Sequence, residues 1–278
     1  MFKRLLYLII ISFLFLPLLS GEEFKTCLSQ ARESLNKGDR ESARVSLENG
    51  IKLWHKGDSI PLLAQAHADL GLILMTQEKL DKALEHYQKA TKLNPKDSRT
   101  YFRMGLIYMA RNQLPEAIKA LDRTTRINSK FTMGYQTLGD AYRRAHQHEN
   151  AIKAYQKALS LSEKPNDALL SGLGESLRVT NDYANAQKYL ENAVSTNPDN
   201  AIAHYQLGLC YLSLKREKDA IIQFEGALKA KAIVQDSFKV QIITYLGQAY
   251  EKSGNLDKAK ECYQKAREIL DNIPYESK

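Results

Sequence analysis

The chain contains few of the residues that interrupt or cross-link a fold. Its 278 residues include 3 Cys, 7 Pro, 14 Gly and 1 Trp. Cys27, Cys210 and Cys262 are odd in number, far apart and without a CxxC pair, so they indicate no disulfide framework. Scarce Gly and Pro, with many Ala, Leu, Lys, Glu and Gln, favour helix. The apolar fraction of 44% is enough for a sizeable core and excludes a disordered chain.

The sequence also lacks the motifs of catalysis and cofactor binding. We find no phosphate-binding loop, no GxSxG motif and no paired-acid signature. Gly172 and Gly174 follow no strand, so they do not indicate a dinucleotide site. His146 and His148, the only close histidine pair, fall in an expected turn and do not share a helix face. We therefore expect no enzyme activity, metal site, cofactor or small-molecule substrate.

Charge of one sign is not concentrated anywhere along the chain. The formal net charge is +8, which is compatible with binding to nucleic acid. However, Lys and Arg alternate with Asp and Glu throughout, as expected for solvated helix surfaces. We expect no nucleic-acid partner.

One long apolar run is present, and it lies at the N-terminus. Lys3 and Arg4 precede Leu5–Leu19, a predominantly apolar run of 15 residues, and Ser20 and Gly21 follow it. This layout predicts a secretory signal peptide over residues 1–21, and hence a periplasmic or cell-envelope location. Cleavage there would put a Leu at the third position back, where a small residue is preferred. An uncleaved N-terminal membrane anchor therefore remains the alternative.

Six glycines that follow a Leu or Met recur at nearly constant spacing. Their intervals are 34, 34, 35, 34 and 39 residues, and the tetrapeptide YQKA occurs at 87–90, 155–158 and 263–266. An Ala stands twelve residues after every one of these glycines. The glycines are Gly71, Gly105, Gly139, Gly174, Gly208 and Gly247, and the alanines are Ala83, Ala117, Ala151, Ala186, Ala220 and Ala259. The chain is one unit copied several times.

Each unit is predicted to be a hairpin of two antiparallel helices. Apolar residues at intervals of three and four lie on one face of a helix, and each unit contains two such sets. A short polar break separates the sets, and there an Asn or Gly can adopt the left-handed conformation that ends a helix. One hairpin cannot bury its apolar face alone, so neighbouring hairpins must stack into a solenoid.

This pattern resembles the tetratricopeptide repeat, whose consensus is large, Leu, Gly, Tyr, then Ala, aromatic, Ala and a closing Pro. Pro95 and Pro198 stand at the closing position. The resemblance covers six repeats, at 64–97, 98–131, 132–166, 167–200, 201–239 and 240–273. Residues 22–57 form a degenerate N-terminal cap with Ala31 in the glycine position, and 274–278 are a tail. The resemblance implies an all-α fold, a right-handed superhelical solenoid whose concave face is lined by the first helices and binds a peptide or protein segment.

The expected groove is the stripe of each first helix that is not used for stacking. Its front part is apolar and rich in Met, its middle is charged, and a second apolar stretch begins at Tyr205. We expect Phe102 and Tyr205 to be aromatic anchors, although some of these side chains could instead pack against neighbouring repeats. The candidate groove residues are Leu72, Met75, Phe102, Arg103, Leu106, Met109, Gln136, Asp140, Arg143, Glu175, Arg178, Tyr205, Leu209, Tyr245 and Gln248. The Lys and Asn set with which related repeats hold acidic chaperone C-termini is absent.

These features together predict a non-enzymatic scaffold that binds a protein or peptide partner, with a role in cell-envelope assembly by analogy. The alternative is a structural subunit that self-assembles by docking of the solenoid ends. The last helix carries Lys258, Lys265 and Arg267 on its outer surface, which favours a monomer.

Overall fold

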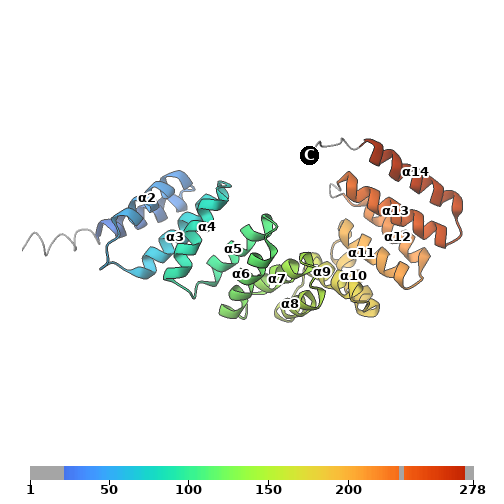
Figure 1. Cartoon of the computed structure of the whole chain (residues 1–278), viewed down its shortest axis with the longest axis horizontal. Helices are drawn as coiled ribbons and strands as arrows, with labels where there is room; N and C mark the ends of the chain where they lie inside the picture. Colours follow the sequence, from blue (N-terminus) through green and yellow to red (C-terminus); the bar gives the residue numbers. More distant parts are fainter. Residues whose placement is uncertain (1–21, 232–234, 273–278) are drawn as a thin grey trace, which may run out of the picture. The chain divides into compact units, whose positions relative to one another are not determined.

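The computed structural model describes residues 22–231 and 235–272, and Figure 1 shows that these residues form helices joined by short turns. The described parts of the chain contain no strand. The expected all-α class is therefore confirmed. The predicted signal peptide and tail, residues 1–21 and 274–278, lie outside the described residues.

The helices form consecutive hairpins. Residues 22–36 are helical and precede α2. The labelled helices are α2 (Arg40–Leu53), α3 (Ile60–Thr76), α4 (Leu80–Leu93), α5 (Ser98–Ala110), α6 (Leu114–Ile127), α7 (Thr132–Arg144), α8 (His148–Leu161), α9 (Asp167–Val179), α10 (Tyr183–Thr196), α11 (Ala201–Ser213), α12 (Glu217–Lys229), α13 (Asp236–Lys252) and α14 (Leu256–Asn272). From α3 onward, each odd-numbered helix packs most extensively against the even-numbered helix that follows it.

A left-handed residue ends the first helix of every hairpin. It lies seven residues after the periodic glycine of the hairpin, or after Ala31 in the first hairpin. Its φ is between +56° and +85°. The residues are Gly38, Glu78, Asn112, His146, Asn181, Lys215 and Gly254. The next N–H then bonds back across the helix end, as from Gln147 to the Tyr142 carbonyl at 2.9 Å. His146 thus lies in a turn, as the sequence predicts.

The periodic glycines lie where the two helices of a hairpin approach closely. A Cβ on Gly139 would lie 2.6 Å from the Tyr155 ring, and one on Gly174 would lie 2.5 Å from Leu190 Cγ. The periodic alanines are equally enclosed, and Ala151 and Ala186 are completely buried. Small residues at these positions therefore allow the large side chain of the second helix to enter the interface.

The chain divides into two compact units, Met1–Ser129 and Lys130–Lys278. In unit 1 a buried cluster runs from Ala31 and Ala43 through Leu70 to Ala120. The hairpin of residues 22–57 therefore shares its core with α3 and α4. In unit 2 another buried cluster extends from Ala151 to Ala259 and includes Tyr155 and Phe224.

Over the described ranges 22–231 and 235–272, we find no helix with the combination of length and apolarity that crossing a membrane requires.

Candidate partner-binding surfaces

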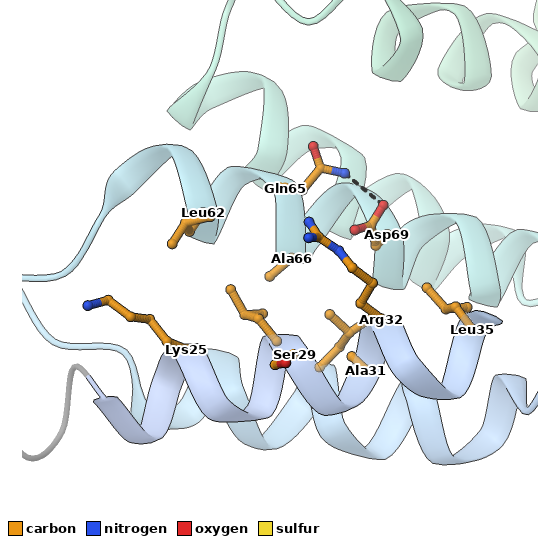
Figure 2. A pocket seen from close by; sticks show the side chains of 11 residues that line it. Lys25, Ser29, Ala31, Arg32, Leu35, Leu62, Gln65, Ala66 and Asp69 are labelled. Carbon is orange, nitrogen blue, oxygen red and sulfur yellow. Dashed lines mark hydrogen bonds between the residues drawn. The ribbon is translucent and has the colours of Figure 1, made fainter. Parts of the chain in front are cut away.

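Unit 1 has a pocket between helix 22–36 and α3. Figure 2 shows side chains from both helices converging on it, and its volume is about 270 Å³. Leu28, Ala31, Leu47 and Ala66 give it an apolar floor. Partly exposed Leu35 and Leu62 also line the pocket, so it is open to solvent.

The rim of this pocket combines exposed leucines with charged groups. Leu35 and Leu62 are 38% and 36% exposed. Arg32 reaches from helix 22–36 toward Gln65 and Asp69 of α3 (Figure 2). Gln65 Nε2 donates a hydrogen bond of 2.8 Å to Asp69 Oδ1. The rim can therefore contact both apolar and polar groups of a ligand.

Asp69 is the half-buried acidic group of the rim. Burial raises the pKa of its carboxyl group, while the Gln65 hydrogen bond and the charges of Arg103 and Arg32 lower it in part. The two arginines thus stabilise the ionised form of this half-buried carboxylate.

The sequence analysis missed the contribution of helix 22–36 to this surface. Leu28, Arg32 and Leu35 lie three residues before, one after and four after Ala31. These are the same offsets that define the groove stripe around each repeat glycine. The spacing was therefore visible in the sequence, although Ala31 stands in the place of the repeat glycine.

The other groove candidates of unit 1 lie on α3 and α5. Leu72, Met75, Phe102, Arg103 and Met109 are half-buried, and Leu106 is 37% exposed. The Met75 Sδ accepts a 4.0 Å contact from the Tyr87 hydroxyl, so it also packs on α4. Leu106 therefore offers the most open apolar side chain among these six candidates.

In unit 2 the charged candidates form a connected network across α7 and α9. The Tyr155 hydroxyl donates to Asp140 Oδ1 at 2.7 Å and accepts from Arg143 Nε at 3.2 Å. Arg143 Nη1 also donates to Glu175 Oε2 at 3.0 Å. Asp140, Arg143 and Glu175, which sequence spacing placed on one surface, are thus brought together.

Burial shapes the protonation of this network. It raises the pKa of Asp140, although Tyr155 and Arg143 both favour the ionised carboxylate. Burial, together with the charge of Asp140, also raises the pKa of Tyr155 far above its usual range. Tyr155 therefore remains protonated and can donate its hydrogen bond.

The network is continued by polar contacts on either side. Arg178 Nε donates to Gln206 Oε1 at 3.1 Å, which joins α9 to α11. Gln136 exchanges amide contacts of 3.3 and 3.5 Å with Asn166. Ser171, on the stripe of α9, is 6% exposed, and its hydroxyl has no partner in the described part of the chain.

Tyr205 has a different role from the one expected. It is only 9% exposed. Its ring makes edge contacts with Phe238 and Tyr245, at centroid distances of 5.1 and 5.8 Å, and also lies against Phe224. The expected open anchor is therefore a packing residue that joins α11 to α13. The sequence spacing did not show this because the covering ring, Phe238, lies in the first turn of α13, outside the repeat positions used to define the stripe.

The remaining candidates of unit 2 lie beside this aromatic cluster. Leu209 and Tyr245 are half-buried and pack against the core, and Gln248 is half-buried on α13. Leu209, Tyr245 and Gln248 are therefore only partly accessible to a ligand.

A buried histidine pair in unit 1 was not expected. His67 Nδ1 of α3 and His86 Nδ1 of α4 lie 2.9 Å apart, and His67 is 7% exposed. Burial, followed by the charges of His86 and Lys89, lowers the pKa of His67 to about 4. Between two neutral rings, the Nδ1–H of one donates a hydrogen bond to the Nδ1 of the other. Within residues 22–231 and 235–272, no group of three or more His, Cys, Asp or Glu residues is arranged to hold a metal ion.

Comparison with known proteins identifies the class of these hairpins. Models described as "Tetratricopeptide repeat" match residues 64–97, 86–119 and 240–273. A model described as "Anaphase-promoting complex, cyclosome, subunit 3" matches residues 144–227. The fold is that of a helical-repeat solenoid, and the chain contains tetratricopeptide repeats at these matched residues.

Individual relatives share the repeat rather than the whole protein. The chain is 34% identical over 100 residues to tetratricopeptide repeat protein 37 of Xenopus laevis. The matched region covers 34% of this chain. The match spans only 6% of that relative.

Two solved structures show the same fold at low sequence identity. The structure titled "YrrB: a TPR protein with an unusual peptide-binding site" has a TM-score of 0.54 at 24% identity. The match covers 67% of this chain and 93% of the YrrB chain. The structure of PilW, titled a "widely conserved type IV pilus biogenesis factor", has a TM-score of 0.63 at 16% identity. The match covers 77% of this chain and 96% of the PilW chain.

Proposed function

We propose that this protein is a non-enzymatic scaffold that binds a peptide or protein segment on the surfaces formed by its first helices. The observation that carries this proposal is the open pocket between helix 22–36 and α3, with its apolar floor and charged rim. A mixed surface of this kind suits a protein segment, which offers apolar side chains for burial and polar groups for the rim. The peptide-binding site named for the similar fold of YrrB supports the same use.

The partner-binding surface of unit 2 is the polar network of Asp140, Arg143 and Glu175, together with Arg178. Its side chains are half-buried and already joined by hydrogen bonds, so they are held in place before a partner arrives. A surface held in this way loses little side-chain entropy on binding.

A capture experiment with paired variants tests the scaffold. The tagged protein is used to isolate partners from the envelope fraction, and their affinity is then measured. Leu106→Asp combined with Arg178→Glu should weaken binding by about 2 kcal/mol, roughly 30-fold, as the loss of interface anchors does.

Ile222→Asp serves as the control, because Ile222 is 61% exposed on α12, a second helix. Equal loss in the control variant, or unchanged binding in the double variant, would contradict the proposed surface.

The protein acts outside the cytoplasm, in assembly of the cell envelope. The signal-peptide layout of residues 1–21 supports export, and the fold shared with the pilus biogenesis factor PilW supports the envelope role. The protein isolated from cells should have the mass of a chain that lacks residues 1 to about 21. Finding Met1 on the extracted protein would instead support an uncleaved anchor.

A second candidate function is self-assembly through the solenoid ends. Leu256, Tyr263 and Leu270 of α14 are 57%, 36% and 53% exposed, and their seven-residue spacing places them on one side of the helix. Sedimentation across a wide range of concentrations separates the two candidates. We expect a constant monomer mass; a mass that rises with concentration and falls back in Leu270→Asp would favour self-assembly.

A further inference from the structure

We infer that the pocket between helix 22–36 and α3 binds a large apolar side chain of the partner, flanked by two carboxylates. This inference rests on the proposed scaffold function and specifies the chemistry of its partner. Size and lining support the apolar part, since a pocket of about 270 Å³ with Leu28, Leu47 and Ala66 at its floor suits a side chain such as Phe, Met or Leu.

The charge of the rim supports the acidic part. Lys25 and Arg32 lie on the helix 22–36 side of the pocket, and Asp69 is the acidic residue that lines it. Arg103 and Asp97 also act on Asp69 with opposite signs, so the positive charge at the rim comes from Lys25 and Arg32 on the helix 22–36 side. Arg32 makes no ion pair within the described part of the chain. Its guanidinium can therefore donate hydrogen bonds to a carboxylate of a ligand.

Lys25 is available to a ligand despite its present partner. It forms an ion pair of 3.1 Å with Glu22, but both side chains are more than half exposed. Such exposed pairs contribute little free energy and exchange readily with other charged groups. A partner carboxylate can therefore compete for Lys25.

The spacing of the two basic residues defines the order of groups in the partner. Lys25 and Arg32 are seven residues apart, which is about two helical turns or roughly 10 Å along the helix. In an extended segment, side chains at the first, third and fifth positions point to one side and span about 13 Å. An acidic residue at the first and fifth positions and an apolar residue at the third therefore match the rim and the floor.

The test measures binding of short labelled peptides to the full chain by fluorescence anisotropy at low salt. The first probe has the sequence Gly-Glu-Thr-Phe-Thr-Glu-Gly. Three matched probes replace both Glu by Gln, both Glu by Lys, or Phe by Ala. We expect the first probe to bind about fivefold more tightly than the Gln probe, as two exposed charge pairs would give, with the preference lost at high salt.

Charge reversal in the protein completes the test. Arg32→Glu should abolish the preference, so that the Glu and Lys probes bind about equally, because Lys25 remains while the second basic site has become acidic. Arg40→Glu makes the same charge change at an exposed residue that does not line the pocket, and it should leave the preference intact.

Three results would overturn the inference: equal binding of the Gln and Glu probes, tight binding of the Ala probe, or an unchanged preference in Arg32→Glu. Absence of binding by every probe would overturn it as well. In each case, partner capture that depends on Leu106 and Arg178 would leave the scaffold function standing. Failure of both experiments would remove the scaffold function too.

Discussion

Tyr155 joins the fold to the candidate surface. Its ring packs so closely on α7 that a Cβ on Gly139 would lie 2.6 Å away, and its hydroxyl bonds Asp140 and Arg143. A Cβ on Gly172 would likewise lie 2.6 Å from the hydroxyl oxygen. Small residues on two first helices therefore fix the position of the phenol that organises the charged network.

Gly139→Ala should destabilise unit 2 because the new methyl group cannot fit beside Tyr155, which is completely buried. Overpacking of this kind typically costs about 1–3 kcal/mol in the free energy of unfolding, measured by urea denaturation. Gly57→Ala is the matched control, because nothing lies within 4 Å of its added Cβ. A control effect as large as that of Gly139→Ala would mean that close packing is not the cause.

His67 should make the stability of unit 1 depend on pH. Its pKa falls from 6.5 to about 4 on folding, chiefly through burial. Above pH 6.5 the ring is neutral in both states, whereas between pH 6.5 and 4 the unfolded chain binds the proton more strongly. The free energy of unfolding should therefore fall as pH is lowered through that window, by up to about 3 kcal/mol, and the loss should level off below pH 4.

His67→Leu isolates this effect. Urea denaturation of both proteins between pH 4 and 8 should give a smaller loss for the variant, although His86, whose pKa burial also lowers, will contribute part of it. Identical pH profiles for the two proteins would contradict the assignment. Lys89 and Glu85 face the pair and remain in both proteins.

The first helices of unit 2 are connected by side chains as well as by stacking. The Arg143–Glu175 ion pair joins α7 to α9, and the Arg178–Gln206 hydrogen bond joins α9 to α11. The side chains of Arg143 and Glu175 are 28% and 19% exposed, so solvent weakens their pairing only in part. Adjacent hairpins are thus held in register at the surface proposed to bind a partner.

A double-mutant cycle with Arg143→Gln and Glu175→Gln should reveal this coupling. We expect the two changes to be non-additive by about 1 kcal/mol in urea denaturation, since they remove one shared interaction. Lys89 and Glu85 form an exposed pair at 2.6 Å within α4 and provide the control cycle, with an expected coupling of about 0.3 kcal/mol. Additivity at Arg143 and Glu175 would show that the observed ion pair contributes no coupling.

The hairpins could be predicted from the sequence because the steps of three and four fix which residues share a helix face. The same register places left-handed residues such as Asn112 and Asn181 in the turns. Contacts between different hairpins could not be predicted, because they depend on rotamers and on helix crossing. Tyr205 was therefore expected to be open, whereas Phe238 covers it. Within a single hairpin, the pairing of His67 with His86 was not predicted either, because both residues lie outside the periodic apolar positions.

At the scale of the whole molecule, each of the two units has its own core and its own candidate surface. Unit 1 offers the pocket between helix 22–36 and α3, and unit 2 offers the network around Arg143. We therefore expect the first helices of both units to bind the partner and the exposed sides of the second helices to face solvent.

Site-specific photo-crosslinking in the native cells tests this central claim most directly. A photoreactive amino acid is placed at Leu35 or Leu106 on first helices, and at Val45 or Ile222 on second helices; all four side chains are at least 37% exposed. The account predicts that the first-helix positions crosslink to a partner protein and that Val45 and Ile222 do not. Crosslinks confined to Val45 and Ile222, or formed only between copies of this chain, would contradict it.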